Sequence, residues 1–186
     1  MVITADHGEM LGEKGLMSHG RPAGMYQPLI RVPLIMHAPG LMPQGVCSDA
    51  LVQCADITRT LASVAGVGES LAPTGAEAVD LRAAAEGAGR PYALCQREGF
   101  PEGRLERAQR QNPSFDFQPH VTHMSAAAQD GWKLIHGRSG ENELYDLRHD
   151  PDESLNLIDE NPERAAELSR VILDWEMRAQ PQTATA

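Results

Sequence analysis

The sequence predicts an α/β part followed by a small antiparallel β subdomain that a C-terminal helix closes. Three observations support this fold class. An apolar, β-branched run at residues 2–5 leads directly into an Asp-His pair and glycines. Alternating apolar segments between 122 and 147 are separated by turn residues, and residues 162–178 carry an apolar stripe at helical spacing. We therefore expect residues 1–90 in the α/β part and residues 91–186 in the antiparallel subdomain.

Length and composition restrict the classes of partner. The chain has 186 residues, 41% of them hydrophobic, which suits one compact domain or two small ones. A formal net charge of −10 argues against nucleic acid or an anionic membrane surface as a partner. The sequence has no apolar run near the roughly 18 residues of a membrane span, so none is predicted. The compartment stays open between cytoplasmic and periplasmic or secreted.

The three cysteines are Cys47, Cys54 and Cys95, and their spacing fits no zinc site or disulfide framework. We expect buried free thiols, with pairing of Cys47 and Cys54 as the alternative.

The first third of the chain alternates between strand-like and irregular sequence. Residues 2–5 are predicted to form a buried strand. Residues 8–28 contain five glycines and two prolines, which predicts an irregular loop with at most a short helical turn. Residues 31–38 are the next strand candidate, and Pro33 restricts it to a sheet edge or to a strand start.

A helix is predicted over residues 48–65, with Asp49 as a possible N-cap and Gly66 as the C-cap. The alternative is a shorter helix, residues 57–65, that Asp56 would cap.

The middle of the chain carries weaker signals. Residues 79–86 are a short helix candidate and residues 92–96 a strand candidate. Residues 97–120 are polar, contain prolines and lack periodicity, which predicts a surface loop insertion, about half of it mobile.

The last third is predicted to be a meander followed by a helix. Residues 122–128 and 132–136 flank an Asp-Gly pair, which favours a tight hairpin turn, and residues 143–147 form the third strand. The final helix is expected to start at Pro162 and to run to about residue 178.

The chemistry-bearing residues lie at the end of the first strand. Asp6 and His7 follow the apolar run directly, and Gly8 allows a sharp turn beside them. In open α/β sheets the carboxyl ends of strands are where ligands bind. Asp supplies a charged oxygen and His a neutral nitrogen, and both are common metal ligands. The pair therefore indicates a metal site, although a strand-end Asp with a merely hydrogen-bonded His is the structural alternative.

This pattern resembles the metal-binding segment of sulfatases, in the alkaline-phosphatase superfamily, and matches only the C-terminal portion of such an enzyme. The family carries a strand, then Asp-His-Gly or Asp-Asn-Gly, then Leu-Gly-Glu-His-Gly, and further motifs in order. The matching residues here, in chain order, are Asp6-His7-Gly8, Leu11-Gly12-Glu13-Lys14-Gly15, Met25-Tyr26, Arg31-Val32-Pro33-Leu34-Ile35, Ala38-Pro39-Gly40, Glu143-Leu144-Tyr145-Asp146-Leu147 and Asp150-Pro151-Asp152-Glu153-Ser154-Leu155-Asn156-Leu157.

The resemblance implies that the first part belongs to an alkaline-phosphatase-like sheet and that the whole enzyme hydrolyses sulfuric esters. Asp6 and His7 would hold a divalent metal, with Ca²⁺ expected and a Mn²⁺- or Zn²⁺-using phosphoester relative as the alternative. His19 stands where the family often has a sulfate-contacting lysine, and Lys14 stands where it often has His. His19 and Lys14 are therefore the catalytic candidates, and Arg21 is a further substrate-contact candidate.

The other acidic residues are predicted to be structural. Glu9 and Glu13 are expected to support the loop or to orient a metal ligand. Asp146, Asp150 and Glu153 resemble a metal cluster but lie in turn sequence, and we expect them to stabilise turns.

The nucleophile that the resemblance implies is absent from the sequence. The family uses a formylglycine made from Cys or Ser in Cys-x-Pro-x-Arg or Ser-x-Pro-x-Arg, and no cysteine here is followed by that pattern. We therefore expect an N-terminal part of the same enzyme to carry it, and the chain alone to be inactive. The substrate would be a small-molecule or glycan sulfate ester. The alternatives are a phosphonate monoester or phosphodiester hydrolase of the same superfamily, and a non-catalytic remnant or interaction module.

Overall fold

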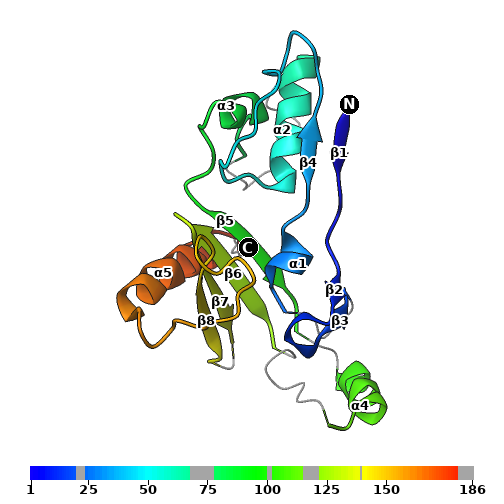
Figure 1. Ribbon diagram of the computed structural model, residues 1–186, viewed down its shortest axis with the longest axis vertical. Helices are drawn as coiled ribbons and strands as arrows, with labels where there is room; N and C mark the ends of the chain where they lie inside the picture. The colour runs from blue at the N-terminus through cyan, green and yellow to red at the C-terminus, as the bar shows by residue number, and fades with distance from the viewer. Residues whose placement is uncertain (20–23, 68–77, 100–101, 115–121, 139, 180–186) are drawn as a thin grey trace, which may run out of the picture. The chain divides into compact units, whose positions relative to one another are not determined.

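A computed structural model describes residues 1–19, 24–67, 78–99, 102–114, 122–138 and 140–179. The chain forms two compact units (Figure 1). The first comprises Met1–Asp6, Pro33–Ala93 and Leu173–Ala186, and the second comprises His7–Val32 and Leu94–Ile172. The units interleave along the chain, and the expected division between residues 1–90 and 91–186 stays a prediction.

In the first unit, β1 (Val2–Thr4) pairs antiparallel with β4 (Leu34–Met36). Both predicted strands are thus present, and Pro33 lies directly before β4 as expected. The expectation that β1 is buried is wrong, because Ile3 is 47% exposed and Ile35 opposite it is 55% exposed. Among the described residues this sheet has two strands, so burial of its faces would need further structure.

Two helices follow in the same unit. α2 (Cys54–Ala65) begins after Gln53, so Asp49 does not cap it, and the shorter alternative beginning at residue 57 is also wrong. Asp56 lies in the first turn and accepts a hydrogen bond from the Gln53 amide at 2.7 Å. Gly66 ends the helix in the left-handed region, with φ 66°, as predicted.

The predicted short helix is α3 (Leu81–Ala85). Asp80 caps it, because its carboxylate accepts a hydrogen bond from the Arg82 amide at 2.9 Å.

The second unit is built on a four-stranded sheet in the order β5-β6-β7-β8. Its strands are β5 (Ala93–Arg97), β6 (Met124–Gln129), β7 (Trp132–Gly137) and β8 (Asn142–Asp146). The last three form the predicted antiparallel meander. Asp130 and Gly131 make the first turn with φ of 52° and 82°, which is the left-handed geometry that an Asp-Gly hairpin turn requires.

α5 (Pro162–Ala179) starts at the predicted proline. Its residues up to Ile172 belong to the second unit, and they bury an apolar stripe made of Ala165, Leu168 and Ile172. The fold class is therefore the predicted one, a set of α/β elements with a small antiparallel sheet and a C-terminal helix. In the described ranges no helix combines the length and apolarity needed to cross a membrane.

The insertion predicted as loop contains a helix, α4 (Glu102–Gln111). Its sequence lacks an apolar stripe of the usual kind, so periodicity does not indicate it. It is nevertheless rich in Glu, Arg, Gln, Leu and Ala, which all have high helix propensity. Residues 100–101 and 115–121 of the expected insertion lie outside the described residues.

The segment predicted as an irregular loop has more order than expected. A short hairpin pairs β2 (Met10–Leu11) with β3 (Met17–Ser18), and a 3₁₀ turn, η1 (Glu13–Gly15), connects them. α1 (Gln27–Ile30) is the predicted short helical turn. Together with the sheet this segment builds an apolar core, formed by Met10, Leu16, Met25, Tyr26, Leu29, Met124, Ala126, Ile135 and Tyr145.

A buried ion pair lies within this unit. Lys133 donates to the carboxylate of Glu153, and the two residues are 1% and 0% exposed. Glu153 also accepts a hydrogen bond from the Gln27 amide at 2.6 Å. Glu153 is therefore structural, as predicted, and it links a turn to β7 and α1. Asp150 is structural too, because it accepts hydrogen bonds from the Ser154 and Leu155 amides at 3.0 and 2.9 Å.

Candidate functional site

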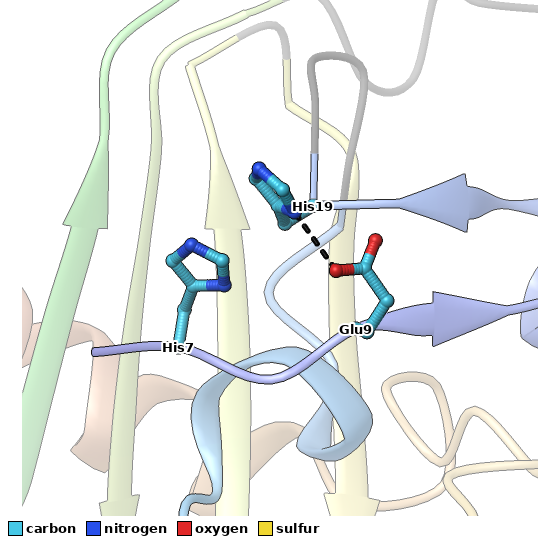
Figure 2. A group of neighbouring side chains, drawn as sticks. All are labelled: His7, Glu9 and His19. Carbon is cyan, nitrogen blue, oxygen red and sulfur yellow. Dashed lines mark hydrogen bonds and ion pairs between the residues drawn. The ribbon is translucent and has the colours of Figure 1, made fainter. Parts of the chain in front are cut away.

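The second unit brings together three exposed side chains that can ligate a metal: His7, Glu9 and His19. One ligand atom from each lies within 4.8 Å of the others. The rings of His7 and His19 have centroids 4.2 Å apart, and His19 Nδ1 is 2.8 Å from Glu9 Oε2. Figure 2 shows the two imidazoles and the carboxylate on the same side of the segment that carries His7 and Glu9.

The β2–β3 hairpin explains why residues ten positions apart meet. Met10 pairs with Ser18 in the hairpin, so Glu9 and His19 are the next residues outward on the two strands. Gly8 anchors the segment, because its amide donates to the Leu29 carbonyl at 2.7 Å. The segment around His7 is thereby held against α1.

The electrostatics of the cluster favour an ionised Glu9. The hydrogen bond with His19 holds the pKa of the Glu9 carboxyl below its ordinary value. An ionised carboxylate only accepts hydrogen bonds, so His19 Nδ1 carries a proton in this arrangement. His7 Nδ1 lies 2.8 Å from the Gly8 carbonyl oxygen, which likewise only accepts. In both rings Nδ1 therefore lies beside an oxygen that accepts a hydrogen bond.

The five residues singled out from the sequence are not all in this cluster. Asp6 belongs to the first compact unit and His7 to the second, so the proposed Asp6–His7 metal pair stays a prediction. His19 lies beside His7, as described above. Arg21 lies outside the described residues.

Lys14 lies among structural partners elsewhere in the second unit. Its Nζ donates to the Glu153 backbone carbonyl and lies 3.5 Å from the Tyr145 hydroxyl. It also lies 5.3 and 5.1 Å from the ring centroids of Tyr26 and Tyr145, within range of a cation–π contact. These contacts attach η1 to the sheet, and a catalytic role for Lys14 stays a prediction.

The sequence predicts that Glu9 supports the loop or orients a metal ligand, and it does not identify Glu9 as a ligand itself. The signal that could have identified it is spacing: residues 7 and 9 share one side of an extended segment. What the sequence does not show is the hairpin that brings His19 back to them.

The donor set can be tested against metal chemistry. Two imidazole nitrogens and one carboxylate oxygen are the ligands of many zinc sites, and the exposed position leaves room for water as a fourth ligand. Ca²⁺ prefers six to eight oxygen ligands, so this cluster by itself fits a borderline cation better.

Comparison with known proteins agrees with the motif series. A family model described as Sulfatase matches residues 1–67. The uncharacterized sulfatase YidJ of Escherichia coli (strain K12) is 29% identical over 160 residues, which cover 86% of this chain and 28% of that protein. The choline-sulfatase of Rhizobium meliloti (strain 1021) is 26% identical over 179 residues, covering 96% of this chain and 30% of that protein. The chain thus spans less than a third of these curated relatives.

Solved structures have the same fold. BT4656, in complex with its substrate D-glucosamine-2-N,6-O-disulfate, gives a TM-score of 0.72 at 25% identity, over 95% of this chain and 34% of that one. The phosphonate monoester hydrolase of Agrobacterium radiobacter gives a TM-score of 0.70 at 23% identity, over 95% of this chain and 34% of that one. The ordered motifs, the match of residues 1–67 to the Sulfatase family model and these relatives together show that the chain is similar to part of a sulfatase.

Proposed function

We propose that this chain contributes the C-terminal part of a metal-dependent sulfuric ester hydrolase. The observation that carries the proposal is the match of residues 1–67 to the Sulfatase family model, since this segment contains every predicted site residue. The relatives that the chain matches include a choline-sulfatase and a structure bound to a disulfated glucosamine. A small-molecule or glycan sulfate ester is therefore the proposed substrate class.

In the proposed site, Asp6 and His7 hold a divalent cation, with Ca²⁺ as the ion, together with ligands from outside this chain. The bound cation would neutralise charge on the sulfate oxygens as the ester is attacked. A formylglycine-type nucleophile would also come from outside this chain.

His19 and Lys14 are the proposed catalytic residues. His19 would orient the ester oxygen or donate a proton to it, and Glu9 would fix the tautomer of His19 through the 2.8 Å hydrogen bond. Lys14 would have to leave its present contact with the Glu153 carbonyl to reach a sulfate group. We therefore assign His19 the larger part in catalysis.

The second candidate function is hydrolysis of a phosphonate monoester or phosphodiester. Structures named as phosphonate monoester hydrolases, from Agrobacterium radiobacter and Silicibacter pomeroyi, have the same fold over at least 95% of this chain.

The test is to express the complete reading frame that contains this chain and to compare kcat/KM for 4-nitrophenyl sulfate, phenyl phosphonate esters and bis(4-nitrophenyl) phosphate. We expect the sulfate to be the best substrate, a chelator to abolish turnover, and His7→Ala and His19→Ala each to lower kcat at least about 100-fold. Arg148→Ala serves as the control, because Arg148 is an exposed residue in the turn after β8.

A kcat/KM that is higher for the phosphonate or the diester than for the sulfate would favour the second candidate function over sulfate hydrolysis. Absence of turnover on all three substrates would favour a non-catalytic role. The 186-residue chain by itself is expected to show no turnover, because the nucleophile segment is not in its sequence.

A further inference from the structure

We propose that His7, Glu9 and His19 form a binding site for a borderline divalent cation such as Zn²⁺, and that this site does not need Asp6. The proposal goes beyond the proposed function, which places an oxygen-preferring ion on Asp6 and His7. It rests on three side chains within one compact unit.

The geometry is the first support. One ligand atom from each of the three side chains lies within 4.8 Å of the others, and the ring centroids of His7 and His19 are 4.2 Å apart. A tetrahedral ion at about 2.0–2.2 Å from each ligand would hold its ligand atoms roughly 3.3 Å apart. All three side chains are exposed, so small rotations about their χ angles can close the remaining distance without disturbing the core. Figure 2 shows the two rings and the carboxylate gathered around a common space.

The backbone that carries these side chains is the second support. The Gly8 amide is bonded to the Leu29 carbonyl at 2.7 Å and the Glu9 amide to the Pro28 carbonyl at 3.1 Å. His19 follows β3, which is paired with β2 in register. Hydrogen bonds therefore hold the backbone that carries the three ligands, both near Gly8 and at the β2–β3 hairpin. This reduces the conformational entropy that would be lost when an ion binds.

The chemistry of the ligands selects the ion. Imidazole nitrogen suits Zn²⁺, Co²⁺ and Ni²⁺, whereas Ca²⁺ and Mg²⁺ prefer sets made of oxygen. Two nitrogens and one oxygen thus favour Zn²⁺ over Ca²⁺ at this position. Solvent reaches the site, so water would complete the coordination.

The experiment uses the full 186-residue chain with Zn²⁺ and Co²⁺ as probes. Calorimetric titration with Zn²⁺ should show a site that takes one ion per chain, and Co²⁺ should give visible absorption bands of a low-coordinate complex. His19→Ala and Glu9→Gln should each weaken Zn²⁺ binding at least about 10-fold. Asp6→Asn should retain the affinity, and millimolar Ca²⁺ should not displace the Zn²⁺.

The chain offers a matched control in His149. Its Nδ1 lies 2.8 Å from Asp146 Oδ2, and its side chain is 83% exposed, so it forms a similar histidine–carboxylate pair outside the cluster. His149→Ala should leave Zn²⁺ binding unchanged. Far-ultraviolet circular dichroism of each variant checks that the fold is retained.

Three results would overturn the proposal. Equal loss of affinity in His149→Ala and His19→Ala would mean scattered binding to surface histidines. Loss of Zn²⁺ binding in Asp6→Asn with full binding in Glu9→Gln would mean that Asp6 and His7 make the only site. No binding to the intact chain would exclude the site altogether. None of these readouts depends on ester hydrolysis, so failure of this proposal can be distinguished from failure of the proposed function. Both sites use His7, so one ion at a time would occupy them.

Discussion

The guanidinium of Arg90 binds the fully buried carboxylate of Asp56 through three hydrogen bonds. Arg90 Nε lies 2.8 and 3.0 Å from the two carboxylate oxygens, and Nη2 lies 2.5 Å from Oδ1. The same carboxylate accepts from the amides of Gln53 at 2.7 Å and Val79 at 2.9 Å. One acidic side chain therefore joins the start of α2 to two later segments of the first unit.

Removing the arginine should destabilise this unit strongly. Arg90→Ala leaves a buried carboxylate without its charged partner, which typically costs about 3–5 kcal/mol. The free energy of unfolding in urea, followed by circular dichroism, measures the loss. Arg82→Ala is the matched control, since Arg82 pairs with the more exposed Asp80 and such pairs contribute about 0–1 kcal/mol. Equal effects of the two changes would contradict the structural role of Arg90.

Alkaline pH should destabilise the second unit through two tyrosines. The Tyr26 hydroxyl donates to both oxygens of Glu143 at 3.0 Å, and the Tyr145 hydroxyl donates to the same carboxylate. Burial, followed by the charge of Glu143, raises the pKa of Tyr26 above its ordinary value. Burial and the hydrogen bond to Glu143 raise the pKa of Tyr145 in the same way.

The sign follows from proton linkage. Unfolded tyrosines lose their protons near pH 10, whereas the folded tyrosines keep theirs, so the folded state binds more protons above that pH. The free energy of unfolding should therefore fall as pH rises through about 10. Lys133 has the opposite effect on the free energy of unfolding at pH values below its ordinary pKa of 10.5, because burial lowers its pKa. It is a single group, whereas the two tyrosines act together. Urea unfolding across the alkaline range tests this, and Tyr26→Phe/Tyr145→Phe should flatten the slope. An unchanged slope in the double variant would refute the assignment.

Much of the fold can be predicted because its signals are local. The Asp-Gly turn, the proline at the start of α5 and Gly66 after α2 each restrict the backbone through their own chemistry. α4 escapes prediction because its helix formers carry no apolar stripe. The burial of β1 is overestimated because an apolar sequence indicates that a strand can be buried. It does not indicate which other elements cover that strand.

The candidate site is only partly predictable. Asp6, His7 and His19 stand out through residue type and the order of the motifs, which are properties of sequence. The proximity of His19 to His7 depends on the β2–β3 hairpin, whose two-residue strands are too short to leave a periodic pattern. The pairing of Lys133 with Glu153 across 20 residues is likewise a tertiary contact that no local signal encodes.

The cysteines should react at different rates. Cys47 and Cys54 are exposed and free, so the expectation of buried thiols is wrong for these two. Cys95 is partly buried, and desolvation raises the pKa of its thiol to about 11, which keeps it protonated at neutral pH. Ellman's reagent at mildly alkaline pH should therefore titrate two thiols rapidly and the third more slowly. Cys95→Ser should leave the rapid phase unchanged, and a rapid phase of three thiols would contradict the raised pKa of Cys95.

Gly8 should be intolerant of any side chain. A Cβ at this position would lie 1.9 Å from the Pro28 carbonyl oxygen, which belongs to the backbone and cannot rotate away. Gly8→Ala should therefore break the hydrogen bond between the amide of residue 8 and the Leu29 carbonyl. The free energy of unfolding should fall by more than about 2 kcal/mol. Because His7 and Glu9 flank this residue, Zn²⁺ affinity should fall with it. Gly103→Ala is the matched control: it lies in α4 with open space around its Cβ, and it should stabilise the protein by up to about 1 kcal/mol. A Gly8→Ala protein as stable as the parent would show that α1 does not pack against this segment as described.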